Sequence, residues 1–233
     1  NSAGRLLKHD DKVKIILEEP TPSPVLAYLA NSDDEITGVI TFTASHNPAT
    51  DDGLKFSPYH GGAADVKTTN AISKFANEAT TYKIADYNEA KDKGLITEMS
   101  LADAINRYVV GYVLPTLKLA GAWDDIVAYI KHNPGFNLAV DAMQGTAVQY
   151  LKAIYGEFAR EAGREFFTLL HPNNRDPDFS QVNGAPNPTL ANSIVDLVAV
   201  VKERSHTFGV AVDGDADRFG TIDFDGNAVT AND

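Results

Sequence analysis

Residues 208–220, FGVAVDGDADRFG, join a short apolar run to three alternating aspartates and an arginine. The apolar run predicts a buried strand, because it is short and uninterrupted. An extended backbone sends alternate side chains to one face, so we expect Asp213, Asp215 and Asp217 to converge on one hard cation. Carboxylates held this close repel one another unless a cation such as Mg²⁺ lies between them. Arg218 adds a planar guanidinium that suits phosphate oxygens.

The acidic loop could also be a helix-loop-helix calcium site or a solvated turn. A helix-loop-helix calcium site also begins with alternating aspartates, but it needs Gly at the sixth position and Glu at the twelfth, where this chain has Arg218 and Phe224. Its loop follows a helix, whereas a strand is expected here. A solvated acidic turn would require neither the apolar strand nor the arginine. The pattern therefore favours a divalent metal site beside a phosphate.

A second polar loop, TASHNP at 43–48, follows the apolar run 36–42. Polar residues at the carboxyl ends of strands form the binding sites of open α/β sheets, so Ser45 suits a nucleophile or a phosphate carrier. A hydrolase is not indicated, because adjacent Ser and His seldom reach the required geometry and a Gly-x-Ser-x-Gly turn is lacking. From these residues alone an ordinary turn, a structural His46 and a solvated Lys55 stay open as alternatives.

Composition limits the class of protein. The chain has 233 residues, 43% of them apolar, and a net charge of −12 at pH 7. The acidic charge and the lack of a basic patch argue against a nucleic-acid partner, and no apolar run reaches the ~18 residues of a membrane span. The absence of cysteine excludes disulfides and thiolate metal sites. Without a signal peptide, the cytoplasm is the expected location, and the sequence does not indicate an oligomeric state.

Apolar periodicity alternates between strand and helix along the chain, which predicts an α/β fold. The expected strands are 13–17, 36–42, 136–141 and 208–212, and the expected helices are 24–30, 101–112, 147–158 and 190–201. The helix after Ser100 begins with a Ser-x-x-Asp cap and is expected to end near Pro115. Asp225 and Gly226 predict a hairpin after the acidic loop.

Two further segments interrupt this alternation. The pattern breaks at 118–124, so we expect a domain boundary there, with one α/β domain at 1–118 and a second at 119–233. The segment 171–188 is rich in Asn, Asp and Pro and predicts a long loop. A surface connection is favoured over a loop that contacts substrate.

Four separated motifs together resemble the α-D-phosphohexomutase superfamily, which includes phosphoglucomutases and phosphomannomutases. They are PTPSP at 20–24, TASHNP at 43–48 followed by Lys55, VDAMQG at 140–145 and DGDADR at 213–218. They occur in the family's order, and the resemblance covers about 13–233. Ala142 stands where the family often has Pro and Gln144 where it often has His, and neither touches the expected chemistry.

The resemblance implies a four-domain architecture, of which this chain would be two consecutive α/β domains with mixed sheets, incomplete at both ends. It implies that Ser45 carries the transferred phosphoryl group. His46 and Lys55 would do acid and base work beside the reacting groups, and Arg218 would contact the phosphoserine. The expected catalytic residues are Ser45, His46, Lys55 and Arg218, and the expected Mg²⁺ ligands are Ser45, Asp213, Asp215 and Asp217.

The implied reaction interconverts hexose 1-phosphate and hexose 6-phosphate through a phosphoserine and a bisphosphorylated sugar, with glucose 1,6-bisphosphate as activator. GGAAD at 61–65 resembles a segment of bacterial phosphoglucomutases, so glucose is the expected sugar. Phosphomannomutase, phosphoglucosamine mutase and a non-catalytic sugar-phosphate or metal-binding relative stay open. A phosphatase with an aspartate nucleophile would have Asp-x-Asp-x-Thr at its first strand, whereas the aspartates of this chain lie late, at 213–217, and are followed by Arg218. The family's third and fourth domains hold the sugar and the distal phosphate, so 1–233 alone is expected to be inactive.

Overall fold

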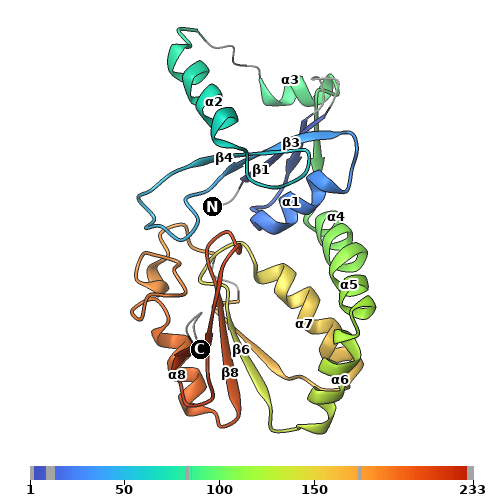
Figure 1. Ribbon diagram of the computed structural model, residues 1–233, viewed down its shortest axis with the longest axis vertical. Helices are drawn as coiled ribbons and strands as arrows, with labels where there is room; N and C mark the ends of the chain where they lie inside the picture. Colours follow the sequence, from blue (N-terminus) through green and yellow to red (C-terminus); the bar gives the residue numbers. More distant parts are fainter. Residues whose placement is uncertain (1–2, 9–13, 82–83, 85, 173–174, 230–233) are drawn as a thin grey trace.

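The computed structural model describes residues 3–8, 14–81, 84, 86–172 and 175–229, which form two five-stranded sheets, one after the other along the chain. In Figure 1 the first sheet and its helices lie above the second, and a run of helices on one side connects them. Both sheets mix parallel and antiparallel strands, which confirms the α/β class with mixed sheets. No described helix is long and apolar enough to cross a membrane.

The first sheet has the strand order β4-β3-β1-β2-β5. Its strands are β1 (Ala3–Lys8), β2 (Lys14–Leu17), β3 (Ile36–Phe42), β4 (Leu54–Pro58) and β5 (Ile96–Met99). Helix α1 (Ser23–Asn31) buries Val25, Leu26 and Leu29 in the same core cluster as Val39 of β3. The strands expected at 13–17 and 36–42 and the helix expected at 24–30 are confirmed, except that Val13 lies outside the described residues.

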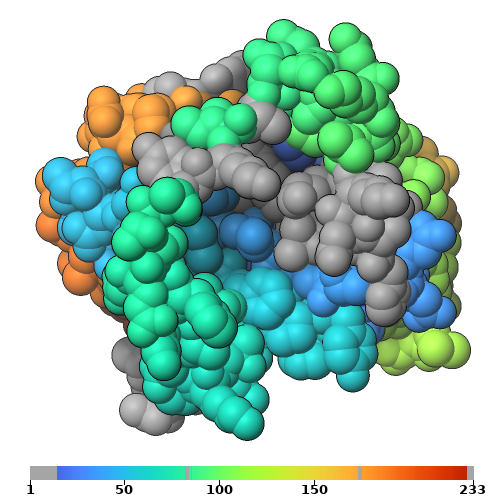
Figure 2. Space-filling view, turned by 90° about the horizontal axis from the view of Figure 1, so that it is seen from above, coloured from blue at the N-terminus to red at the C-terminus, as the bar shows by residue number. Residues whose placement is uncertain are grey.

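Two helices of this half had no counterpart among the expected elements. They are α2 (Val66–Glu78), whose first turn Asp65 caps by accepting the Thr68 N–H, and α3 (Tyr87–Asp92). Helix α2 buries none of its residues, and Figure 2 shows it as a ridge at the end of the molecule. Its large apolar residues, Val66, Ile72 and Phe75, are exposed.

The connecting helices are α4 (Leu101–Ile105), the π-helix η1 (Asn106–Val113), α5 (Leu114–Leu119) and α6 (Ala122–His132). Ser100 caps α4 as expected, by accepting the Asp103 N–H. The expected end near Pro115 is wrong, because the chain stays helical to Leu119. Pro115 is the second residue of α5 and directly follows the π-helix, so the chain changes its helical pitch at the proline instead of ending there.

The second sheet has the order β10-β9-β8-β6-β7. Its strands are β6 (Asn137–Asp141), β7 (Phe167–Leu170), β8 (Thr207–Val212), β9 (Phe219–Ile222) and β10 (Ala228–Val229). Helices α7 (Val148–Ala162) and α8 (Val195–Glu203) lie on opposite sides of it (Figure 1). Leu138 packs in the α7 cluster and Ala139 in the α8 cluster, because alternate residues of β6 face opposite ways. The strands expected at 136–141 and 208–212, the helix at 147–158 and the final hairpin are confirmed.

The helix expected at 190–201 begins five residues late, at Val195. Two successive turns occupy this stretch: the Asn187 side chain and carbonyl accept the N–H groups of Thr189 and Leu190, and the Leu190 carbonyl accepts the Ser193 N–H. Such local turns compete with helix formation. The boundary expected at 118/119 stays a prediction; the chain there lies at the end of α5, and Gly121, with φ of 75°, precedes α6.

Candidate functional site

The two polar loops singled out in the sequence lie against each other. The serine loop follows β3 and the acidic loop joins β8 to β9. The Ser45 hydroxyl donates a hydrogen bond of 2.9 Å to Oδ2 of Asp213. Residues from the two halves of the chain thus form one site.

Hydrogen bonds to a side chain within the loop and to the residue before β4 hold the serine loop in place. Ser45 has a φ of 58°, and its N–H donates to Oγ1 of Thr43 at 2.9 Å. The Thr43 N–H in turn donates to the carbonyl of Gly53. A Cβ added to Gly53 would lie 2.5 Å from the backbone oxygen of Thr43. Only glycine allows β4 to begin this close to the loop. These contacts direct the Ser45 hydroxyl toward the acidic loop.

The acidic loop is a tight turn, which corrects the expectation of an extended backbone. Ala216 has a φ of 58° and donates its N–H to the Asp213 carbonyl, while the Arg218 N–H donates to Oδ1 of Asp213. One carboxylate oxygen each of Asp213, Asp215 and Asp217 still lies within 4.8 Å of the others. The turn, rather than the pleat of a strand, produces this convergence. Because the loop lies between antiparallel strands, it is also not a helix-loop-helix calcium site.

The VDAMQG motif packs beneath this turn. A Cβ on Gly145 would lie 2.5 Å from the carbonyl oxygen of Gly214 and 2.8 Å from its Cα. The Thr146 N–H donates to the same carbonyl at 3.0 Å. The glycine of the motif therefore permits backbone contact with the metal loop.

The buried aspartates have different proton affinities. Asp213 and Asp215 are 0% and 1% exposed. Burial raises the pKa of Asp213 to about 6; the Arg218 N–H opposes the shift and the Asp215 charge adds to it. Burial also acts to raise the pKa of Asp215, but the Ser23 hydroxyl and the Lys55 ammonium outweigh it, so this pKa lies below its usual value. The site stabilises one negative charge well and two poorly.

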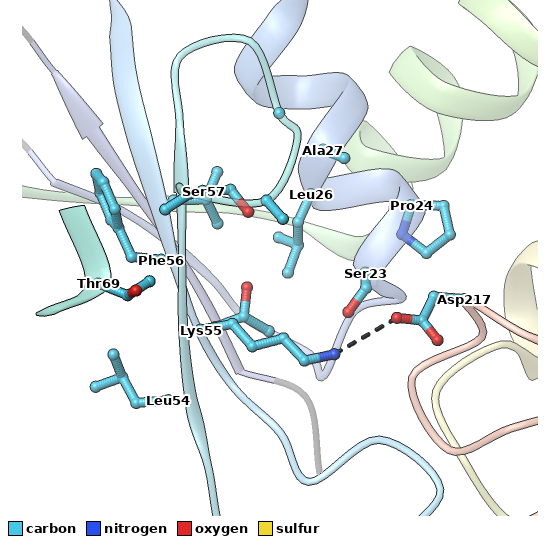
Figure 3. A pocket seen from close by; sticks show the side chains of 15 residues that line it. Ser23, Pro24, Leu26, Ala27, Leu54, Lys55, Phe56, Ser57, Thr69 and Asp217 are labelled. Atoms are coloured by element: carbon cyan, nitrogen blue, oxygen red, sulfur yellow. Dashed lines mark hydrogen bonds and ion pairs between the residues drawn. The ribbon is translucent and has the colours of Figure 1, made fainter. Parts of the chain in front are cut away.

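Lys55 supplies the nearest positive charge to the aspartates. Its Nζ lies 3.1 Å from Oδ2 of Asp215 and 3.4 Å from Oδ2 of Asp217, and Figure 3 shows the chain of Lys55 extended toward Asp217. Burial acts to lower the pKa of Lys55, but the charges and hydrogen bonds of the two aspartates raise it overall. Lys55 is therefore an ammonium ion at neutral pH.

Arg218 and His46 complete the rim. The Arg218 guanidinium contacts the His46 ring, with Nη1 3.1 Å from Nε2, and its Nε lies 3.6 Å from Asp217. Ser45, His46, Lys55 and Arg218 all line one open pocket of about 670 Å³. The structure thus brings together every residue expected to take part in catalysis.

The donor set fits a hard divalent cation. Oδ1 of Asp215 is buried and has no hydrogen-bond partner among the described residues. A buried carboxylate oxygen without a donor is costly, and a cation would satisfy it. The three aspartates offer the oxygen ligands that Mg²⁺ prefers, and Asp217 is the exposed one.

Sequence reasoning missed two hydroxyl groups of the site. Oδ2 of Asp215 accepts hydrogen bonds from Ser23 at 2.8 Å and from Thr43 at 3.1 Å. Both belong to quoted motifs, but neither carried a role there. The available signal was a hydroxyl residue within a motif that borders the site.

The segment 171–188 also supports the site, although 173–174 lie outside the described residues. Phe179 and Val182 are buried, so the expectation of a surface connection is wrong for this part of it. The carbonyl of Gly184 accepts the Ala49 N–H at 3.0 Å, which joins the segment to the serine loop. Apolar residues within an otherwise polar loop were the signal that could have revealed this packing.

Comparison with known proteins agrees with this arrangement. The family models "Phosphoglucomutase/phosphomannomutase, alpha/beta/alpha domain I" and "domain II" match residues 6–83 and 122–226. Phosphoglucomutase 2 of Saccharomyces cerevisiae is 33% identical over 215 residues, which are 87% of this chain and 36% of the yeast protein. Phosphoglucosamine mutase 2 of Shewanella frigidimarina is 27% identical over 220 residues, which are 93% of this chain and 43% of that protein.

The fold is similar to the crystal structure of parafusin, a phosphoglucomutase from Paramecium, in its open form. The TM-score is 0.66 at 22% identity, over 93% of this chain and 41% of parafusin. At this identity the likeness concerns the fold alone. The chain spans 36% to 43% of the length of these relatives.

Proposed function

Because the chain belongs to the phosphoglucomutase/phosphomannomutase family, we propose that it contributes the phosphoryl-transfer site of a phosphohexomutase. Such an enzyme interconverts hexose 1-phosphate and hexose 6-phosphate through a phosphoserine and a bisphosphorylated sugar. One observation carries the proposal: the Ser45 hydroxyl lies 2.9 Å from Asp213, within the cluster of three aspartates.

Asp213, Asp215 and Asp217 would hold Mg²⁺, with an oxygen of phosphorylated Ser45 as a further ligand. The orphaned Oδ1 of Asp215 supports this assignment. When bound, Mg²⁺ would neutralise charge on the phosphoryl group as it moves.

In the first half-reaction the bond between Ser45 Oγ and phosphorus breaks while phosphorus bonds to a sugar hydroxyl oxygen, and the hydroxyl proton passes through a base to Ser45 Oγ. In the second half-reaction the bond between phosphorus and the other phosphorylated sugar oxygen breaks while phosphorus bonds to Ser45 Oγ, and the serine proton passes to that sugar oxygen. Lys55 is protonated, so it would stabilise negative charge or donate a proton rather than accept one. Arg218 would bind phosphate oxygens from the rim. His46 is beside it and is the candidate for moving the hydroxyl proton.

The substrate class is a hexose phosphate, and glucose is our preferred sugar on the strength of GGAAD at 61–65. Relatives include both phosphoglucomutases and phosphoglucosamine mutases, so the sugar is the part of the proposal that a substrate panel must decide. Glucose 1,6-bisphosphate would phosphorylate Ser45 and so activate the enzyme.

The test is to incubate the intact protein with Mg²⁺ and glucose 1,6-bisphosphate and to locate phosphate by mass spectrometry. We expect phosphate on Ser45, no phosphorylation or mutase turnover in Ser45→Ala, and both properties kept in Ser57→Ala. Ser57 is the matched control, because it lies on β4 in the neighbouring pocket (Figure 3). Phosphate at another residue, or near-normal turnover by Ser45→Ala, would contradict the assignment.

A further inference from the structure

One oxygen of Asp215 receives three hydrogen bonds from the first half of the chain. Oδ2 accepts from the Ser23 hydroxyl at 2.8 Å, the Thr43 hydroxyl at 3.1 Å and the Lys55 ammonium at 3.1 Å. Oδ1 is buried and accepts none from the described residues. The two oxygens therefore have opposite surroundings, and Oδ1 alone is available to a cation.

Ser23 contacts Asp215 twice. Besides the hydroxyl contact, its backbone N–H donates to the Asp215 carbonyl at 2.8 Å. Ser23 is the first residue of α1, whose N-cap Pro22 supplies no side-chain hydrogen bond. The first N–H groups of a helix lack partners within it, and its positive end favours a carboxylate. Figure 3 shows Ser23 at this end of α1, close to Lys55 and Asp217.

The hydroxyl of Ser23 has a narrower set of contacts than the other two donors. Thr43 also accepts the Ser45 N–H, and Lys55 also pairs with Asp217. Replacing either would disturb the serine loop or the charge of the site. Ser23→Ala removes only the hydroxyl contact and leaves the backbone contact to Asp215 in place.

We propose that Ser23 is a positioning residue for the metal site: its hydroxyl holds Oδ2 of Asp215 so that Oδ1 faces the cation. The inference rests on the proposed function, since it takes the three aspartates as the Mg²⁺ ligands. Under this proposal, the affinity for Mg²⁺ also depends on the contact between the start of α1 and the acidic loop. Loss of a contact that orients a metal ligand typically weakens metal binding about 10- to 100-fold.

The experiment measures Mg²⁺ affinity of the intact protein by isothermal titration calorimetry. The variants are Ser23→Ala, Ser23→Thr and the control Ser57→Ala, which alters a hydroxyl in the same pocket. We expect Ser23→Ala to bind Mg²⁺ at least about tenfold more weakly, Ser23→Thr to recover most of the affinity, and Ser57→Ala to match the unsubstituted protein.

Thermal unfolding in EDTA and in Mg²⁺ distinguishes an effect of Ser23→Ala on the metal site from a general loss of stability. We expect the rise in Tm on adding Mg²⁺ to be smaller in Ser23→Ala than in the unsubstituted protein. Unchanged Mg²⁺ affinity in Ser23→Ala, or no recovery in Ser23→Thr, would overturn the inference and leave the proposed function intact. Absence of Mg²⁺ binding by the unsubstituted protein would overturn both.

Discussion

The Ser45 hydroxyl donates to Oδ2 of Asp213 at 2.9 Å, although the two residues are 168 positions apart in the chain. Asp213 is also the aspartate whose pKa burial raises to about 6. The serine that would carry phosphate therefore contacts the carboxylate that is least stable as an anion. Added negative charge on Ser45 would make this repulsion worse, which is a physical reason for a cation at this point.

Neutralising the two buried aspartates is expected to change stability in opposite directions. In EDTA at pH 7.5, Asp213→Asn should raise the free energy of unfolding by about 1 kcal/mol, because the fold disfavours the Asp213 anion. Asp215→Asn should lower it by about 1–3 kcal/mol, because it weakens hydrogen bonds to a charged group. Urea unfolding of both variants measures the two free energies of unfolding. Equal destabilisation by the two substitutions would contradict the prediction. Both variants should also lose Mg²⁺ binding, because each lacks one of the proposed ligands.

Lys55→Gln should lower mutase turnover without weakening Mg²⁺ binding. Removing a positive charge close to Asp215 and Asp217 should leave Mg²⁺ affinity unchanged or higher, while mutase turnover falls about 10²- to 10⁴-fold. Calorimetry and a coupled mutase assay on the intact protein give the two readouts. Lys74→Gln is the control, because Lys74 is an exposed residue of α2. Weaker Mg²⁺ binding by Lys55→Gln would show that Lys55 organises the ligands.

Gly145→Ala should destabilise the protein by about 1–3 kcal/mol, because the new Cβ would lie 2.5 Å from the Gly214 oxygen and force the metal loop aside. Gly156→Ala is its matched control. A Cβ there meets nothing within 4 Å, and the residue lies inside α7, so this change should stabilise by about 0.5–1 kcal/mol. Chemical denaturation compares them. Similar effects of the two changes would mean that Gly145 and Gly214 are not in backbone contact.

His171 should make stability depend on pH. Its Nδ1 lies 3.4 Å from Asp141 and its Nε2 lies 3.3 Å from Asp196. The hydrogen bond to Asp141 raises the pKa of His171, burial opposes the shift, and Asp196 adds to it. A raised folded-state pKa means that this stabilisation is complete below the unfolded-state pKa of about 6.5 and disappears as pH rises through the folded-state pKa.

The variant His171→Asn tests this, because Asn tolerates the φ of 51° at this position. Its deficit in unfolding free energy should be up to about 1 kcal/mol larger at pH 5.5 than at pH 9. His206→Asn is the control, since the exposed His206 has a φ of 60°. A deficit that does not change with pH would leave His171 with a packing role only.

Local patterns were enough to predict the strands that end at the site and the convergence of Asp213, Asp215 and Asp217. The runs before 43–48 and 213–218 are confirmed as β3 and β8, because a buried strand needs mainly apolar residues over a short stretch of sequence. Capping by Ser100 and the final hairpin were equally local. Roles carried over from the family resemblance stay proposals for His46, Lys55 and Arg218.

Features that depend on distant contacts could not be predicted in this way. Pro115 lies within a helix, directly after a π-helix, and the aspartates converge through a turn at Ala216 rather than along a strand. Ser23 and Asp215 are 192 positions apart, and nothing in either segment marks the other as its partner. Hydrogen-bond partners are set by which surfaces the packed core brings together, so the environment of each aspartate, and with it each pKa, exists only once both halves have folded against one another.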